Sequence, residues 1–401
     1  NDYNGNLVFL HQDTVGTGNL MPISVNHVYN NNDRTKTIAP FTGDFGVGWR
    51  LNVSQLVQYN SSTGLKSYID EDGTVHYFKS TANSEGYFED EAGPQYRIKL
   101  VGSNFELLDS SDRKYDFTLY STSNNVNSYL LTRITDENGN FILLSYTGSR
   151  LDKVTDGASR ETTFTYDTNN RLSVIKDPAE RVTTYTYSGG YLTEITHPDQ
   201  RKSIYTYDTS GLNAGNLLSA TDKENSSGGY RITYTYTSIS YVFQPSRVTS
   251  INESNTSLTP TASGKSYSLT YGSNTTVMKD NVANTKEIYT FNNDGNTTNA
   301  RDGNDIATYY GYDLDPNAKN SLISASKPQK TVLNYLKDTS GELTSSSWSY
   351  YSLGGPLGSN VYDTDEKVFG TRSLKVEKSV AAGSYFYQQQ INSLTKGKTY
   401  T

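Results

Sequence analysis

The sequence contains no cysteine, which excludes disulfide bonds, cysteine-ligated zinc and a cysteine nucleophile together. It is also short of charged and apolar side chains, which make up 19% and 34% of its 401 residues. Typical globular domains contain about 25% charged residues. No apolar run approaches the ~18 residues of a membrane helix, so we expect no membrane span. The net charge of −7 argues against a nucleic-acid partner, which normally needs a basic face on the protein.

The chain is rich in tyrosine and glycine, with 34 and 32 residues, and in threonine, serine and asparagine. Tyrosine and threonine favour strands, whereas glycine and asparagine favour tight turns. An aromatic content of 12% is too high for a disordered chain. The composition therefore predicts an extended all-β protein with many short strands. Because the chain opens without methionine, we expect it to be a piece of a longer polypeptide.

A sequence motif of about 20 residues recurs from residue 130 onward. The copies begin Leu-x-x-Ile-x-Asp, with Val in place of Ile in one of them, as at residues 131–136 and 151–156, and a tyrosine follows ten residues after the sixth position. His197 takes the place of the acidic residue in one copy. We expect the acidic residues and the tyrosines to be structural repeat positions: Asp136, Asp156, Asp177, Tyr146, Tyr166, Tyr187, Tyr207 and Tyr312.

Each copy is typical of a β-hairpin, in which a strand, an Asp- or Asn-rich turn and a second strand follow one another. Alternation in the second strand, as at residues 183–187, places the aromatic rings on one face and the threonines on the other. An isolated hairpin is marginal in water, so the copies must stack. We expect a one-layer sheet with two solvent-exposed faces, whose tyrosines pack edge to edge. Strand twist should coil this sheet into a wall around a cavity.

The repeat, with its Tyr-x-Tyr-Asp ending, resembles the Rhs/YD-repeat family, which includes wall-associated proteins of Gram-positive bacteria and, more distantly, the animal teneurins. Residues 1–129 resemble the segment that precedes the repeats in that family, and residues 46–49 resemble its Gly-x-Gly-Trp turn. The resemblance extends over residues 1–338. It implies a spiral β-cocoon that encloses a C-terminal toxic polypeptide until delivery. The family's self-cleaving segment and toxin domain are missing here, so we expect a partial wall that is inert by itself.

The chain changes character after residue 343. A Gly-x-x-Ser-Leu-x-Val segment at residues 370–376 and a tyrosine-rich segment after it resemble the front half of a jelly-roll carbohydrate-binding module. The candidate sugar-stacking residues are Trp348, Tyr350, Tyr385 and Tyr387, with burial in a sandwich core as the alternative. The expected domains are an Rhs N-terminal segment (1–129), a YD-repeat hairpin array (130–338) and a truncated carbohydrate-binding-module-like β-sandwich (343–401).

Nothing in the sequence indicates catalysis, a cofactor or a metal. The four histidines are far apart and have no metal-ligand spacing, so we expect structural roles for His11, His27, His76 and His197. No nucleophile elbow or phosphate-binding loop is present. The repeat aspartates recur at one structural position, whereas a catalytic acid should differ from its neighbours in environment. We therefore expect a protein that is not an enzyme.

These observations predict a non-catalytic shell segment of a secreted or cell-wall-associated bacterial toxin. Its partner would be the enclosed toxin or the rest of the shell, with cell-wall polysaccharide as a further candidate. One alternative is a cell-wall glycan-binding adhesin. A second is a β-propeller-type polysaccharide-processing enzyme, because two copies span the ~40 residues of a propeller blade. Against the propeller, neighbouring copies look equivalent and no Trp-Asp blade signature appears.

Overall fold

The computed structural model describes residues 2–16, 20–34, 44–93, 95–223, 228–237, 246–313 and 320–326, together with four short strands near the C-terminus. The chain divides into two compact units, residues 1–327 and 328–401. The all-β prediction is confirmed, since the described elements are strands apart from two 3-10 turns, η1 (Asn31–Asp33) and η2 (Gly211–Asn213). Residues 1–129 and the described part of the repeat array lie together in the first unit.

Eight strands close into a small barrel in the first unit. They pair in sequence order, and the last strand returns to pair with the first. The step between the third and fourth strands is the single bridge between Phe78 and Asp90. Large rings fill the interior, among them Phe105 and Phe117. The strands are β4 (Leu56–Asn60), β5 (Lys66–Ile69), β6 (Val75–Tyr77), β7 (Phe88–Glu89), β8 (Tyr96–Val101), β9 (Asn104–Asp109), β10 (Lys114–Ser123) and β11 (Val126–Thr135).

Strand β11 joins the barrel to the repeat array. Its residues 126–130 pair with β4, whereas residues 133–135 pair with β12 (Phe141–Thr147). A small apolar cluster of Leu56, Ile69 and Leu130, with Tyr146 packed against it, fills the junction. The first repeat strand therefore grows from a barrel strand, without a linker between them.

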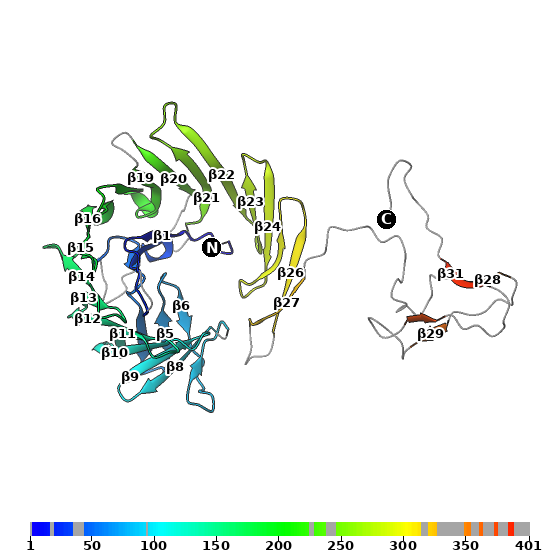
Figure 1. Ribbon diagram of the computed structural model, residues 1–401, viewed down its shortest axis with the longest axis horizontal. Helices are drawn as coiled ribbons and strands as arrows, with labels where there is room; N and C mark the ends of the chain where they lie inside the picture. Colours follow the sequence, from blue (N-terminus) through cyan, green and yellow to red (C-terminus); the bar gives the residue numbers. More distant parts are fainter. Residues whose placement is uncertain are drawn as a thin grey trace. The chain divides into compact units, whose positions relative to one another are not determined.

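The repeats form one continuous antiparallel ladder. Within the described residues, sixteen strands from β12 to β27 pair in sequence order and follow an arc (Figure 1). A propeller would divide them into separate four-stranded blades, so the propeller alternative is wrong. The strands after β12 are β13 (Arg150–Thr155), β14 (Glu161–Tyr166), β15 (Leu172–Lys176), β16 (Val182–Ser188), β17 (Tyr191–Thr196), β18 (Lys202–Tyr207), β19 (Leu217–Lys223), β20 (Gly229–Tyr236), β21 (Val248–Asn255), β22 (Ala262–Tyr271), β23 (Thr275–Asp280), β24 (Thr285–Phe291), β25 (Thr297–Arg301), β26 (Ala307–Tyr312) and β27 (Leu322–Ser326).

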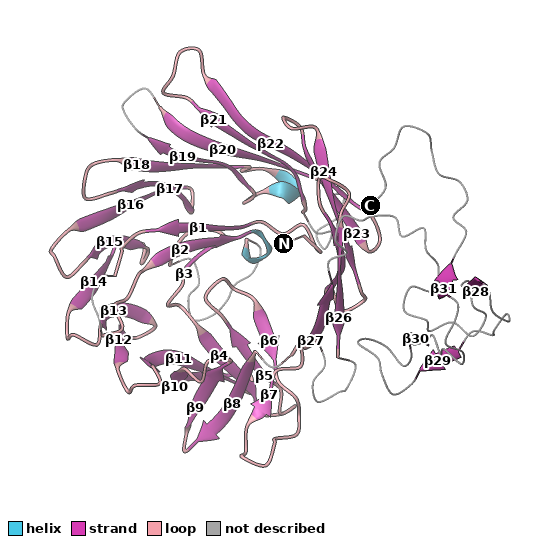
Figure 2. Cartoon of the chain, turned by 45° about the vertical axis from the view of Figure 1, so that its right-hand side comes forward, coloured by secondary structure: helices cyan, strands magenta, loops and turns pink. Residues whose placement is uncertain are grey.

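A three-stranded inner sheet lies on the concave side of this arc, as Figures 1 and 2 show. Its strands are β1 (Val8–Gln12), β2 (Asn26–Asn30) and β3 (Trp49–Leu51), paired in that order. Backbone hydrogen bonds tie the N-terminal segment to the wall at three places. They join Leu172 N to the carbonyl of Asp44 (2.8 Å), Val47 N to that of Gly190 (3.1 Å) and Val248 N to that of Gly5 (3.0 Å).

The expectation of two solvent-exposed faces is wrong where this inner sheet covers the repeat ladder, which forms the wall. Tyr185 and Tyr205 of the wall are only 6% and 2% exposed. The ring of Tyr205 lies 4.8 Å from that of Trp49 in β3, and Phe9 of β1 packs beside both. The physical reason is that the N-terminal segment supplies apolar side chains to the wall, so both share one core.

The Gly-x-Gly-Trp motif forms the turn into β3. The N–H of Trp49 donates to the carbonyl of Gly46 at 3.1 Å. Gly48 has a positive φ of 78°, and a Cβ there would lie 2.6 Å from the ring of Tyr29. Glycine is therefore required at this position both for its backbone conformation and for space.

In the second unit the structure describes two strand pairs. β28 (Ser349–Leu353) pairs with β31 (Ser384–Gln388), and β29 (Val361–Asp363) pairs with β30 (Ser373–Lys375). Of the candidate sugar-stacking residues, Trp348 lies outside the described residues. Tyr350 lies on β28 opposite Tyr387 on β31, where Tyr385 also lies. The carbohydrate-binding module stays a prediction.

Candidate functional site

The predicted repeat tyrosines tie neighbouring strands together through their hydroxyl groups. Each donor lies fifteen residues after its acceptor, the backbone carbonyl of the first residue of the same copy. The bonds are Tyr146 to Leu131 (2.8 Å), Tyr166 to Leu151 (3.1 Å), Tyr207 to Leu192 (2.6 Å) and Tyr312 to Thr297 (2.9 Å). The expected edge-to-edge packing is replaced by these bonds, since no described ring pair joins two successive repeat tyrosines.

Tyr187 is the exception among the five predicted tyrosines. Its hydroxyl is buried without a hydrogen-bond partner, and this burial raises its pKa. The copy that contains Tyr187 is also the one in which Leu172 donates its N–H to the carbonyl of Asp44. The N-terminal segment therefore docks at a copy that lacks the tyrosine bond.

The repeat aspartates hold the hairpin turns. Oδ1 of Asp156 accepts hydrogen bonds from the N–H groups of Ala158 and Arg160, both at 2.9 Å. Oδ2 of the same residue accepts one from Nε of Arg160 at 2.8 Å. Asp136 and Asp177 accept the equivalent two backbone bonds. The predicted structural role of these three residues thus has a geometric basis in the turn.

His197 occupies the aspartate position but does not hold its turn in this way. The carboxylate of Asp199 accepts the bond from the N–H of Arg201 at 3.1 Å instead. The ring of His197 points toward the wall's contact with β1, and its centroid lies 5.2 Å from that of His11. Burial and the nearby His11 lower the pKa of His197. Because His197 replaces the turn-holding aspartate, its side chain is available for contacts with β1.

Ser203 of β18 lies at the centre of a partly buried hydrogen-bond cluster between the wall and β1. Its residue is 1% exposed. The hydroxyl donates to Oδ1 of Asp222 at 2.5 Å, and Nε2 of His11 and Nε2 of His197 lie 3.1 and 3.0 Å from it. A serine hydroxyl has one proton and two lone pairs, so these three partners use its full hydrogen-bonding capacity.

Asp13 holds the other side of His11. Its carboxylate lies 2.9 Å from Nδ1 of His11 and also contacts Nδ1 of His27. Burial alone would raise the pKa of Asp13, but the two histidines outweigh it and lower that pKa to about 2. The carboxylate is therefore ionised at neutral pH and can only accept, so both Nδ1 atoms carry protons.

The chemistry of this cluster follows from where its protons are. Asp13, His11 and Ser203 stand in the order of a hydrolase triad. In a triad, however, the histidine takes the serine proton, whereas here Ser203 gives it to Asp222. With its proton given to Asp222, Ser203 has none to pass to His11. The arrangement acts as a clamp between β1 and β18. The histidine at the aspartate position was the sequence signal that could have revealed it.

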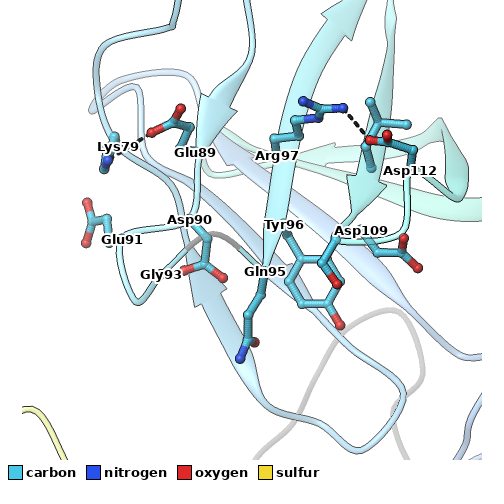
Figure 3. Close-up of a pocket in the computed structure, with 12 residues that line it drawn as sticks. Lys79, Glu89, Asp90, Glu91, Gly93, Gln95, Tyr96, Arg97, Asp109 and Asp112 are labelled. Carbon is cyan, nitrogen blue, oxygen red and sulfur yellow. Dashed lines mark hydrogen bonds and ion pairs between the residues drawn. The ribbon is translucent and has the colours of Figure 1, made fainter. Parts of the chain in front are cut away.

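A second clamp lies in the barrel. Nδ1 and Nε2 of His76 lie 2.8 Å from Asp90 and 3.2 Å from Asp70. Burial alone would lower the pKa of His76, but the two carboxylates outweigh it and raise that pKa to about 9. A pocket of about 250 Å³ lies beside Asp90 and Tyr96 (Figure 3). The ion pairs Lys79–Glu89 and Arg97–Asp112 line this pocket.

In the part of the chain that the structure describes, no group of three or more His, Asp or Glu side chains is placed to hold a metal ion. No helix in that part is long and apolar enough to cross a membrane.

Comparison with known proteins identifies the repeat. Residues 166–202 match the family model described as RHS Repeat. The tRNA nuclease WapA of Bacillus subtilis strain 168 is 24% identical over 173 residues, which are 43% of this chain and 6% of that protein. The tRNA3(Ser)-specific nuclease WapA of Bacillus spizizenii gives the same values. The chain thus matches only a small part of these relatives.

Among solved structures, TcdB2-TccC3 without its hypervariable C-terminal region has a TM-score of 0.31 at 15% identity, over 72% of this chain and 20% of that one. TcdB2-TccC3-Cdc42 has a TM-score of 0.29 at 12% identity, over 76% and 22%.

Proposed function

Because this chain is an Rhs/YD-repeat protein, we propose that its first unit is a segment of a non-enzymatic shell wall that encloses a passenger polypeptide. The observation that carries the proposal is the single ladder from β12 to β27, which bends as one arc. Each copy adds a similar hairpin, and four of the five predicted tyrosines form the same hydroxyl bond, so the curvature can continue over further copies. A wall of this kind separates a concave side from solvent.

The small part of the relatives that this chain matches also supports the proposal. The relatives are named as tRNA nucleases, but this chain matches 6% of their length. We assign any such activity to a passenger elsewhere in the polypeptide. The serine cluster fits a structural role, because the proton of Ser203 is committed to Asp222. The natural protein would be secreted or held at the bacterial cell wall.

The experiment is limited proteolysis of the natural polypeptide that carries this chain together with the segment that follows it. Trypsin should leave the passenger intact while the wall is closed. Ile175 is fully buried in the shared core, and Ile175→Asp should open the wall and expose the passenger to cleavage. Val174→Asp changes the neighbouring, partly exposed residue on the opposite face and serves as the matched control. A passenger that is cut equally fast in the unaltered protein would contradict the proposal.

A further inference from the structure

Strand β1 has one free edge. The N–H of Asn31 donates to the carbonyl of Leu7, and that of Asp13 donates to the carbonyl of Val25. In an antiparallel pair such bonded positions alternate, so Phe9 and His11 direct their backbone groups toward β2. Val8, Leu10 and Gln12 direct theirs the other way, and no described strand pairs with β1 on that side.

A groove runs along this edge. Its volume is about 420 Å³, and four consecutive residues of β1, from Phe9 to Gln12, line one side. The opposite side is formed by the turn before β18 and by the end of β19. A volume of this size is within the ~300–1,000 Å³ of ordinary ligand pockets.

Basic side chains line the groove in a chain whose net charge is −7. Arg201, Lys202 and Lys223 line it together with Asp222, and Arg201 and Lys202 already form ion pairs with Asp199 and Glu194. Asp222 is already engaged by the hydroxyl of Ser203. Among the described residues no ion pair involves Lys223, so the ammonium group is available to an anionic ligand.

The edge also lacks the features that keep exposed strands from pairing. Natural edge strands are protected by charged residues, proline or bulges. The sequence of β1, Val-Phe-Leu-His-Gln, contains none of these, and its pairing with β2 is regular. Val8 and Leu10 are 38% and 58% exposed. Such an edge would be a liability on an outer surface, but here it lies on the concave side of the wall.

We propose that the free edge of β1 binds an extended, acidic peptide segment as a fourth strand of the inner sheet. Main-chain bonds to Val8, Leu10 and Gln12 would hold the segment, while aliphatic side chains contact Leu10 and a carboxylate meets Lys223. This is strand addition, in which backbone bonds give affinity and alternate side chains give specificity. The inference rests on the proposed function, since the natural occupant would be a stretch of the enclosed passenger.

The test uses the full 401-residue chain and a capped pentapeptide that alternates glutamate with valine. Amide hydrogen exchange is followed residue by residue at millimolar peptide. Exchange should slow at least tenfold at Val8, Leu10 and Gln12 and stay unchanged at Phe9 and His11, whose amides already bond to β2. Equal slowing at all five amides, or no slowing at any, would overturn the inference.

Peptides with N-methylated backbone amides test whether main-chain hydrogen bonds hold the peptide. N-methylation at the glutamates and N-methylation at the valines remove donors from opposite edges of the same peptide. One version should lose binding and the other should keep it, and equal binding of both would contradict strand addition. In the protein, Leu10→Pro removes an edge donor without breaking a bond to β2, and it should weaken binding about tenfold. Leu10→Ala keeps the donor and is the matched control.

Charge reversal tests the chemistry of the occupant. Lys223→Glu should weaken the acidic peptide about tenfold, equivalent to roughly 1.4 kcal/mol, and favour a peptide with lysine in place of glutamate. Equal affinity of the unaltered chain for both peptides would refute the acidic preference. If the passenger is protected from trypsin while the edge binds neither peptide, this inference fails and the shell proposal stands.

Discussion

The tyrosine bonds provide an internally controlled test of the wall, because equivalent residues differ in a single hydrogen bond. Tyr166 bonds only to the carbonyl of Leu151, at 3.1 Å. Removing its hydroxyl should cost about 0.5–1.5 kcal/mol of folding free energy, the usual net value of one such bond. Tyr207 bonds to Leu192 and also accepts from Nε1 of Trp49 at 2.7 Å. Tyr207→Phe orphans that buried N–H as well, so its cost rises to about 2–4 kcal/mol.

Tyr187 supplies the control within the same repeat array. Its hydroxyl is buried without a partner, so Tyr187→Phe loses no bond and should be neutral or stabilising by up to about 1 kcal/mol. The assay is urea unfolding of the three variants, followed by tryptophan fluorescence and circular dichroism to check that both report one transition. Equal losses in all three variants would show that the losses do not follow the hydrogen bonds removed, and would refute the reasoning.

Three further predictions concern two buried charged groups and one buried serine. The pKa of His76 is about 9 in the folded chain, above its ordinary 6.5. The charged His76 should therefore stabilise the fold by about 2–3 kcal/mol below pH 6.5, and this stabilisation should disappear as pH rises through 9. A melting temperature that falls in the same way at alkaline pH in His76→Gln would disprove this. Burial raises the pKa of Asp44 to about 6. Asp44→Asn should therefore stabilise the chain by about 1–2 kcal/mol above pH 6 and have no effect below pH 3.8. Denaturation of the variant and the unaltered chain above pH 6 and below pH 3.8 tests this. Ser203→Ala should cost about 1–3 kcal/mol, because it leaves Nε2 of the buried His11 without its partner. Ser173→Ala on the exposed face should cost under about 0.5 kcal/mol, and similar losses of the two variants in urea unfolding would argue against the clamp.

The local structure of the wall could be predicted from the sequence because the signals are local. The alternation at residues 183–187 places Tyr185 in the core and leaves Thr184 and Thr186 on the other face, as expected, whereas Thr183 is buried on the side of Tyr185. The aspartate turns could be predicted for the same reason, since Asp177 bonds within its own four following residues.

The contacts across the concave side could not be predicted in this way. His11 and Ser203 are 192 residues apart, and they meet only because the wall curves around the inner sheet. The closure of β11 onto β4 likewise depends on the curvature of the intervening strands. Composition gives the number of apolar residues but not where they pack, so it missed the share of the core that Phe9 and Trp49 bring from the N-terminal segment.

The central claim is that this ladder is part of a wall with a polypeptide held on its concave side. Electron cryomicroscopy of the natural polypeptide, with the segment that follows residue 401 included, tests it most directly. We predict that the ladder continues beyond β27 and that density not belonging to the wall fills the space it encloses. A following segment that folds as a separate body outside the arc, with nothing enclosed, would contradict the account.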